Sequence, residues 1–206
     1  MARTQANDYK QKKTHIVDVA TELFASKGFH ATSIMDIAKA CNTSKSSLYH
    51  YFDSKEQLLY VILYDHAVIL RDSFLPINND SNADASDKLE IFAQKLLFHN
   101  VSSRSKHKLI LGELDSLGAQ KKNEISILLR EPIESIFDSL VNINPELEVY
   151  KFLQFPVAMM YIGMINWTHT WFSGEGELST DVFGKLLCDT FINGFSNIDL
   201  RKHLIL

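Results

Sequence analysis

Apolar residues recur at intervals of three and four along most of this chain, and few residues interrupt the pattern. In the stretch from residue 10 to residue 27 they are Ile16, Val19, Ala20, Leu23 and Phe24. This spacing places the side chains on one face of an α-helix. The 206 residues include only four Pro and eight Gly, which favours long helices over the many turns of an all-β fold. We therefore predict an all-α fold of about nine helices.

Two of the predicted helices are short and follow each other closely. Ser33 predicts the N-cap of a helix that ends near residue 41, and Ser44 predicts the N-cap of a helix that ends near Tyr51. Asn42-Thr43 lies between them and predicts a tight turn, because Asn tolerates positive φ. This spacing is typical of a helix-turn-helix, whose second helix enters the major groove of DNA.

Longer helices are expected in the rest of the chain. The predicted ranges are 55–75, ended by Pro76; 87–101; 106–114; 122–141, kinked at Pro132; 146–172, with Pro156 inside; and 180–195. The polar residues 78–86 predict a loop. Helices of this length with short connections are expected to pack into a helical domain that follows the helix-turn-helix.

Charge is distributed unevenly along the chain, whose net charge is -4. Residues 1–55 carry eight Lys and Arg against five Asp and Glu, whereas residues 56–206 carry thirteen against twenty. A basic segment on an acidic body is expected when only that segment meets phosphate. We predict a DNA-binding domain over residues 1–55 and a ligand-binding and dimerisation domain over residues 56–206.

The second short helix has a surface of small hydroxyl side chains, with one Lys at its start and Tyr and His at its far end. Small side chains allow a helix to approach base edges and phosphates closely, and the larger ones offer hydrogen-bond donors. Short helix pairs also occur in many all-α proteins, and a polar face of this kind can simply be solvated. Spacing alone leaves both interpretations open.

The segment from Ile16 to Leu59 resembles the N-terminal domain of the TetR/AcrR family of transcriptional regulators. The matching residues are Ala20, Phe24, Gly28-Phe29, Thr32, Ile37-Ala38, Ser44-Lys45, Leu48 to Phe52, Ser54 to Glu56 and Leu58-Leu59. The resemblance implies that Leu48 and Phe52 hold the recognition helix from behind. It implies DNA contacts by Thr32, Ser33, Thr43, Ser44, Lys45, Ser46, Ser47, Tyr49, His50, Tyr51 and Lys55. Asn42 and Ser46 depart from the family pattern, in which Gly is common at the first position and a small residue at the second.

The region from Phe152 to Phe172 is apolar on nearly every side. A helix that is hydrophobic all round must be buried all round, so we expect it to pack with the last helix in the interface of a symmetric homodimer. The residues expected in this interface are Trp167, Trp171, Phe183, Leu187 and Phe191. The alternative is that both helices belong to the core of a monomer. Two recognition helices one turn of DNA apart match a palindromic operator.

The resemblance also implies a small-molecule effector bound among the middle helices. The apolar periodicity gives as candidate ligand-binding residues Phe92, Leu96, Leu111, Leu114, Phe137, Met160 and Met164. Met-rich linings suit large apolar molecules. The segment from Gly163 to Phe172 is similar to a motif of acyl-CoA-responsive members of the family, so the effector is expected to be small and largely apolar, an acyl-CoA being one such molecule.

Sequence motifs of catalysis or metal binding are absent: the chain has no Gly-rich phosphate loop, no Gly-x-Ser-x-Gly and no His-Glu-x-x-His. Cys41 and Cys188 have no metal or redox spacing and are expected to be small buried side chains. We therefore expect no cofactor, metal or enzymatic activity. With no signal peptide and no apolar stretch of membrane-spanning length, we expect a cytoplasmic protein without a membrane partner.

The predicted function is a ligand-responsive repressor that leaves its operator when the effector binds. One alternative is a DNA-binding or partner-binding helical protein that needs no ligand. Another is a helical enzyme without recognisable motifs.

Overall fold

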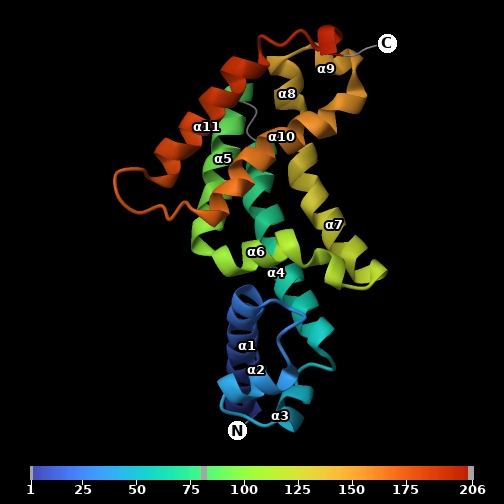
Figure 1. Cartoon of the computed structure of the whole chain (residues 1–206), viewed down its shortest axis with the longest axis vertical. Helices are drawn as coiled ribbons and strands as arrows, with labels where there is room; N and C mark the ends of the chain where they lie inside the picture. The colour runs from blue at the N-terminus through green and yellow to red at the C-terminus, as the bar shows by residue number, and fades with distance from the viewer. Residues whose placement is uncertain (1, 80–82, 204–206) are drawn as a thin grey trace. The chain divides into compact units, whose positions relative to one another are not determined.

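The computed structural model describes residues 2–79 and 83–203 (Figure 1). Over these residues it contains the α-helices α1 to α11, four short 3-10 helices and no strand, which confirms the all-α prediction. The helices are more numerous than the nine expected, because two long predicted helices are each divided. The chain forms two compact units. The first comprises the described residues of Met1–Ala67 and Ser105–Ser126, and the second those of Val68–Arg104 and Ile127–Leu206.

The first unit contains the predicted helix-turn-helix and a segment from the middle of the chain. Its helices are α1 (Ala2–Lys27), α2 (Ile34–Ala40), α3 (Lys45–Tyr49), the start of α4 (Lys55–Asn79), most of α6 (Arg104–Gly112), η1 (Leu114–Ser116) and the start of α7 (Ala119–Glu134). Gly28 has φ +89° and its N–H donates to the Phe24 carbonyl, so it ends α1 as a left-handed residue. The predicted division at residue 55 stays a prediction, because compactness does not by itself separate DNA binding from effector binding.

The second unit contains the remaining helices. These are the rest of α4 and α7, α5 (Ala85–Ser102), α8 (Phe137–Ile143), α9 (Glu146–Val149), η2 (Lys151–Leu153), α10 (Gln154–Asn166), η3 (Trp167–Thr170), α11 (Thr180–Phe195) and η4 (Leu200–His203). Aromatic rings form its core: Phe74 and Phe92 stack with centroids 4.4 Å apart, and Tyr161 lies 4.7 Å from Phe191. The Tyr161 hydroxyl donates to the Leu89 carbonyl at 2.7 Å, which satisfies its buried polar end.

At three prolines the helix boundaries differ from those that the sequence predicts. Pro76 does not end α4, which continues to Asn79; Ile77 is buried, and its packing holds the last turn. After Pro132 the helix stops at Glu134 instead of kinking, and the Ser135 hydroxyl donates to the Pro132 carbonyl at 2.6 Å. Pro156 is the third residue of α10, where the backbone needs no N–H donor. The predicted helix 146–172 is therefore divided into α9, η2, α10 and η3.

Other expectations concern cysteines, membranes and metals. Cys188 is buried as expected, whereas Cys41 is only half-buried. Across residues 2–79 and 83–203, none of the helices combines the length and apolar character needed to span a bilayer. The same residues contain no cluster of three or more His, Cys, Asp or Glu side chains able to hold a metal ion.

Helix α11 packs against α5 in the second unit, and the two come very close at Gly184 (Figure 1). A Cβ atom at Gly184 would lie 2.7 Å from Cγ of Gln94 and 3.0 Å from its Cα and N. Two of these three atoms belong to the backbone, so a methyl group there must push the helices apart. Only glycine fits this crossing without a shift.

We predict that Gly184→Ala lowers the free energy of unfolding by about 1–3 kcal/mol, because overpacking strains the crossing. Gly194→Ala is the matched control on the same helix, since a Cβ atom there meets nothing within 4 Å. It should be neutral or stabilise by up to about 1 kcal/mol. Urea denaturation followed by circular dichroism measures both; equal effects of the two variants would contradict the close approach.

Candidate nucleic-acid interface

The two short helices are capped as predicted. Ser33 and Asp36 form a reciprocal capping box: the Ser33 hydroxyl accepts from the Asp36 N–H at 3.1 Å, and the Asp36 carboxylate accepts from the Ser33 N–H at 2.8 Å. At α3 the Ser44 hydroxyl accepts from the Ser47 N–H at 3.1 Å. These bonds satisfy backbone donors that the first turn of a helix leaves without partners.

The turn between α2 and α3 is held by Asn42, which has φ +51°. Asn is one of the few residues that adopt this left-handed conformation readily, so the predicted turn is confirmed and Asn42 replaces the common Gly without a change of geometry. The Thr43 N–H donates to the Ala38 carbonyl at 2.9 Å and closes the turn.

Two buried side chains hold α3 from behind. Leu48 is 2% exposed and Phe52 3% exposed, and on α2 Ile37 and Ala38 are buried as well. The Lys13 ammonium lies 5.5 Å from the centre of the Phe52 ring, which adds a contact from α1. The other face of α3 is thereby left to solvent.

Most side chains predicted to contact DNA lie on this outer face. Those exposed to solvent are Ser33, Ser44, Lys45, Ser46, Tyr49 and His50, and those half-buried are Thr43, Ser47 and Tyr51. The Lys45 ammonium lies 5.8 Å from the centre of the Tyr49 ring. Eight of the eleven predicted residues thus lie within residues 43–51, and Ser33 is exposed at the start of α2; contact of these nine with DNA stays a prediction.

Thr32 and Lys55, the other two residues predicted to contact DNA, have different roles. Thr32 is 1% exposed and its hydroxyl donates to the Gly28 carbonyl at 2.8 Å, so the prediction that it faces DNA is wrong. The Lys55 ammonium donates to the carbonyls of Phe29 at 2.8 Å and Thr32 at 2.9 Å, and it lies 4.3 Å from the centre of the Phe29 ring. Lys55 therefore holds the α1–α2 loop instead of presenting a free charge.

The α6–η1 segment also makes polar contacts with α1 and the loop that follows it. Lys108 donates to the Ala25 carbonyl at 2.6 Å, near the C-terminal end of α1. The Glu113 carboxylate accepts from the Phe29 N–H at 3.3 Å and from the Ser116 hydroxyl at 2.8 Å. Residues more than 80 positions apart in sequence thus fix the same loop that Lys55 holds. The sequence did not predict these contacts, because no local pattern identifies partners so far apart in the chain.

Tyr9 and Lys12 on α1 were also missed. The Tyr9 ring lies 4.8 Å from Tyr51 and 6.3 Å from His50, at the end of the recognition helix. The Lys12 side chain forms an exposed ion pair with Asp8 at 2.9 Å, and this carboxylate raises the pKa of Lys12. A signal was available: positions 9, 12 and 16 are spaced for one helix face, and Ile16 on that face is buried.

The candidate ligand-binding residues do not form one group. Phe92 and Leu96 are buried, Leu114 and Phe137 are half-buried, and Leu111, Met160 and Met164 are exposed. Met160 is 63% exposed because Tyr161 and Ile165, both 0% exposed, take the inner face of α10. The prediction that Leu111, Met160 and Met164 line an enclosed pocket does not fit these positions.

The residues predicted for a dimer interface divide between surface and core. Trp167 is 68% and Trp171 55% exposed, and Leu187 is half-buried. Phe183 and Phe191 are each 8% exposed, so their assignment to the interface does not fit. Phe183 packs 4.8 Å from Phe172 and Phe191 packs against the core tyrosine. The apolar side chains that α11 does expose are Val182 and Leu186.

Two family models together match most of the chain. The family described as bacterial regulatory proteins, tetR family, matches residues 16–61, and the tetracyclin repressor-like C-terminal domain matches residues 82–195. The curated regulator YuxN of Bacillus subtilis (strain 168) is 38% identical over 93 residues, which are 44% of this chain and 32% of that protein. This chain therefore matches only about a third of that relative's length.

IcaR of Staphylococcus epidermidis, a negative transcriptional regulator of the biofilm operon icaADBC, is 32% identical over 129 residues, 63% of this chain and 67% of that protein. Among solved structures, a TetR-family transcriptional regulator from Bordetella parapertussis 12822 has a TM-score of 0.83 and 33% identity, covering 90% of this chain and 96% of that one. AibR in complex with isovaleryl coenzyme A and operator DNA has a TM-score of 0.70 and 21% identity, covering 89% and 97%. The second likeness shows the fold alone.

We predict that Lys55→Ala lowers the free energy of unfolding by about 1–3 kcal/mol, because two backbone carbonyls lose a charged donor. Lys45→Ala removes the same charge from an exposed side chain and should change stability by less than about 0.5 kcal/mol. Urea denaturation checks both variants. If Lys55→Ala is as stable as Lys45→Ala, Lys55 does not hold the loop.

Proposed function

Because the chain belongs to the tetR family of bacterial regulatory proteins, we propose that it is a ligand-responsive transcriptional repressor. It binds a palindromic DNA operator as a homodimer and leaves it when a small, largely apolar molecule binds the second unit. The single observation that carries the proposal is the outer surface of α3, where small hydroxyl groups, Lys45 and Tyr49 face solvent above two buried anchors.

The dimensions and chemistry of α3 suit the major groove. With five residues it is only about 7.5 Å long, so it enters end-on with its first turn toward the bases. Ser44, Ser46 and Ser47 keep this end narrow and offer hydroxyls to base edges or phosphates. Tyr49 and His50 supply donors at the far end, and Lys45 supplies a charge for the backbone.

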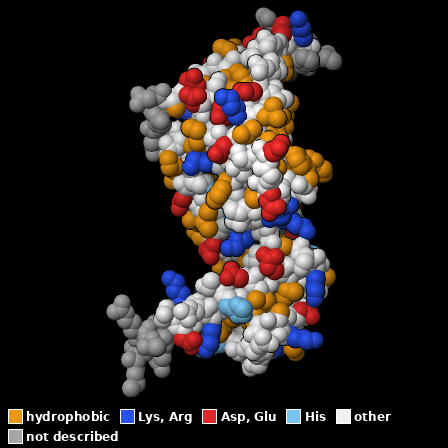
Figure 2. Space-filling model, turned by 90° about the vertical axis from the view of Figure 1, so that its left-hand side faces the viewer, with side chains coloured by type: hydrophobic (Ala, Val, Ile, Leu, Met, Phe, Trp, Pro, Cys, Tyr) orange, Lys and Arg blue, Asp and Glu red, His pale blue; other side chains and the backbone are white. Residues whose placement is uncertain are grey.

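An exposed apolar surface on α10 and α11 supports the homodimer (Figure 2). Its exposed members are Phe155, Met159, Met160, Met164, Trp167, Trp171, Val182 and Leu186. Monomeric proteins seldom leave so many large apolar side chains together in water. The sequence requires α10 to be buried on all sides, and its inner face alone packs within the chain. A second copy of the chain that presents the same surface would bury the outer face of α10.

The interior of the second unit suits an uncharged group. Its buried polar residues are His99, Asn100, Ser139, Asn144 and Thr168, and none of the described Asp, Glu, Lys or Arg side chains is buried there. Burial lowers the pKa of His99, so this ring stays neutral at pH 7. The absence of buried charge among the described residues of this unit favours an acyl chain or a comparable apolar group as the ligand. AibR, which shares the fold, binds isovaleryl coenzyme A, and an acyl-CoA is the effector class we propose.

Release from DNA then requires no chemical reaction. The effector shifts a conformational equilibrium only by its difference in affinity between the operator-binding state and a second state of the dimer. Lys108 on α6 bonds to the end of α1, and Glu113 directly after α6 bonds to the α1–α2 loop. A displacement of α6 within the first unit therefore reaches the helix-turn-helix through these two bonds.

We predict that selection from a random duplex library yields a palindromic sequence with half-sites about one helical turn apart. Lys45→Ala should weaken binding to the selected duplex. It should also reduce the slope of log Kd against log salt by about 0.9 for each protomer that binds. Fluorescence anisotropy measures both. Failure of the wild-type protein to enrich any sequence would overturn the DNA-binding proposal.

We predict that Met160→Asp converts the dimer to a monomer, because a carboxylate in the buried interface is left without a partner. Ile127→Asp is the matched control: Ile127 is 62% exposed on α7 and Met160 is 63% exposed on α10. Light scattering at micromolar concentration gives the mass of each. A monomeric wild-type protein, or an unchanged dimer in Met160→Asp, would contradict the assignment of this surface.

A further inference from the structure

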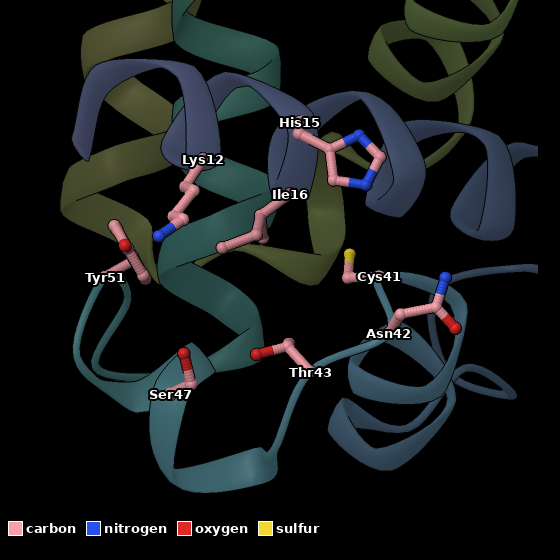
Figure 3. A pocket seen from close by; sticks show the side chains of 8 residues that line it. All are labelled: Lys12, His15, Ile16, Cys41, Asn42, Thr43, Ser47 and Tyr51. Atoms are coloured by element: carbon pink, nitrogen blue, oxygen red, sulfur yellow. The ribbon is translucent and has the colours of Figure 1, made fainter. Parts of the chain in front are cut away.

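A hollow of about 160 Å³ lies in the first unit between α1 and the helix-turn-helix (Figure 3). Its lining residues are Lys12, His15, Ile16, Cys41, Asn42, Thr43, Ser47 and Tyr51. Three of them, Thr43, Ser47 and Tyr51, belong to the recognition segment, by which we mean α3 and its flanking residues (residues 43–52). A duplex seated on α3 therefore borders the opening of this hollow.

The lining is suited to an anion. None of its eight residues carries a carboxylate, whereas Lys12 carries a positive charge and three residues carry hydroxyl groups. Figure 3 shows the Lys12 side chain reaching from α1 toward Tyr51, with Ser47 on the helix below. Lysine and hydroxyl side chains are among the groups that proteins commonly use to contact DNA phosphates.

Contacts between α1 and the recognition segment give Lys12 a defined place beside α3. The ring of Tyr9, one turn before Lys12, lies 4.8 Å from the Tyr51 ring at an interplanar angle of 31°, and the Lys13 ammonium lies 5.5 Å from the centre of the Phe52 ring. These contacts lie at the C-terminal end of the recognition helix. The turn of α1 from Tyr9 to Lys13 thus packs against the element that enters the groove, so little freedom is lost when it meets DNA.

The present partner of Lys12 is a weak one. Asp8 and Lys12 are separated by 2.9 Å, and both side chains are 61% exposed. Exposed pairs of this kind contribute little to stability, so the ammonium can exchange the carboxylate for a phosphate at small cost. Asp8 itself repels a phosphate at the same position.

We propose that the turn of α1 around Lys12 is a second DNA-contact surface, in which Lys12, with the hydroxyls of Ser47 and Tyr51, binds a phosphate of the duplex backbone. This inference rests on the proposed function, since it needs α3 to be seated in a groove. It extends the interface beyond the helix-turn-helix. It also assigns a ligand class, the phosphate group, to the hollow that Cys41 and Asn42 help to line.

The test is the salt dependence of binding to the duplex selected for the wild-type protein. Lys12→Gln should weaken binding roughly three- to tenfold at low salt. It should lower the log–log slope by about 0.9 for each bound protomer, which is about 1.8 for a dimer. Asp8→Asn should strengthen binding, because it removes a repulsive charge.

Matched controls come from an equivalent ion pair in the second unit. Lys151 and Glu148 are also 2.9 Å apart, with side chains 69% and 61% exposed. Lys151→Gln and Glu148→Gln change the net charge as Lys12→Gln and Asp8→Asn do, and should leave affinity and slope unchanged. Thermal denaturation confirms that the variants fold, which their exposure favours.

The outcomes separate the two proposals. If the wild-type protein binds the duplex and Lys12→Gln has the same affinity and slope, the α1 surface is not a phosphate contact. An equal effect of Lys12→Gln and Lys151→Gln overturns it as well, because the loss then reflects net charge alone. If the wild-type protein binds no duplex, the proposed function itself fails.

Discussion

A helix of five residues has no stability of its own, and the first unit is arranged around this constraint. Helix formation in water needs many more residues than α3 contains. Leu48 and Phe52 therefore anchor it from one side, and Ser44 caps its first turn. The buried anchors lie on one side of the helix, and its other side is exposed and available for recognition. The same shortness that makes α3 dependent on its neighbours allows it to enter a groove end-on.

The features that the sequence predicts correctly are those decided by neighbouring residues. The cap at Ser33 and the positive φ of Asn42 depend on interactions within four positions. Features decided by distant residues were predicted less well. Thr32 and Lys55 occur in a family pattern, and their environment is set by the α1–α2 loop. The structure buries Thr32 and gives Lys55 two carbonyl partners in the loop, and contact of Lys55 with DNA stays a prediction.

Periodicity has a similar limit in α10 and α11. It shows that a helix has an apolar stripe, but when nearly every side is apolar it does not tell which side faces the chain's own core. The sequence therefore predicted Phe183 and Phe191 for the dimer interface, although Val182 and Leu186 are the exposed residues of α11. It also predicted that Met160 binds the ligand, although Met160 is exposed. The inner side is decided by Tyr161, whose hydroxyl reaches the Leu89 carbonyl on α5. Such a long-range bond has no local signature.

The exposed apolar side of α10 has a consequence for gene dosage. If it is closed only by a second copy, the species able to grip both half-sites forms by mass action. At low abundance its amount then rises with the square of the copy number. Halving the cellular concentration of the protein would cut operator occupancy by more than half, so a promoter under its control would respond to small changes in its synthesis.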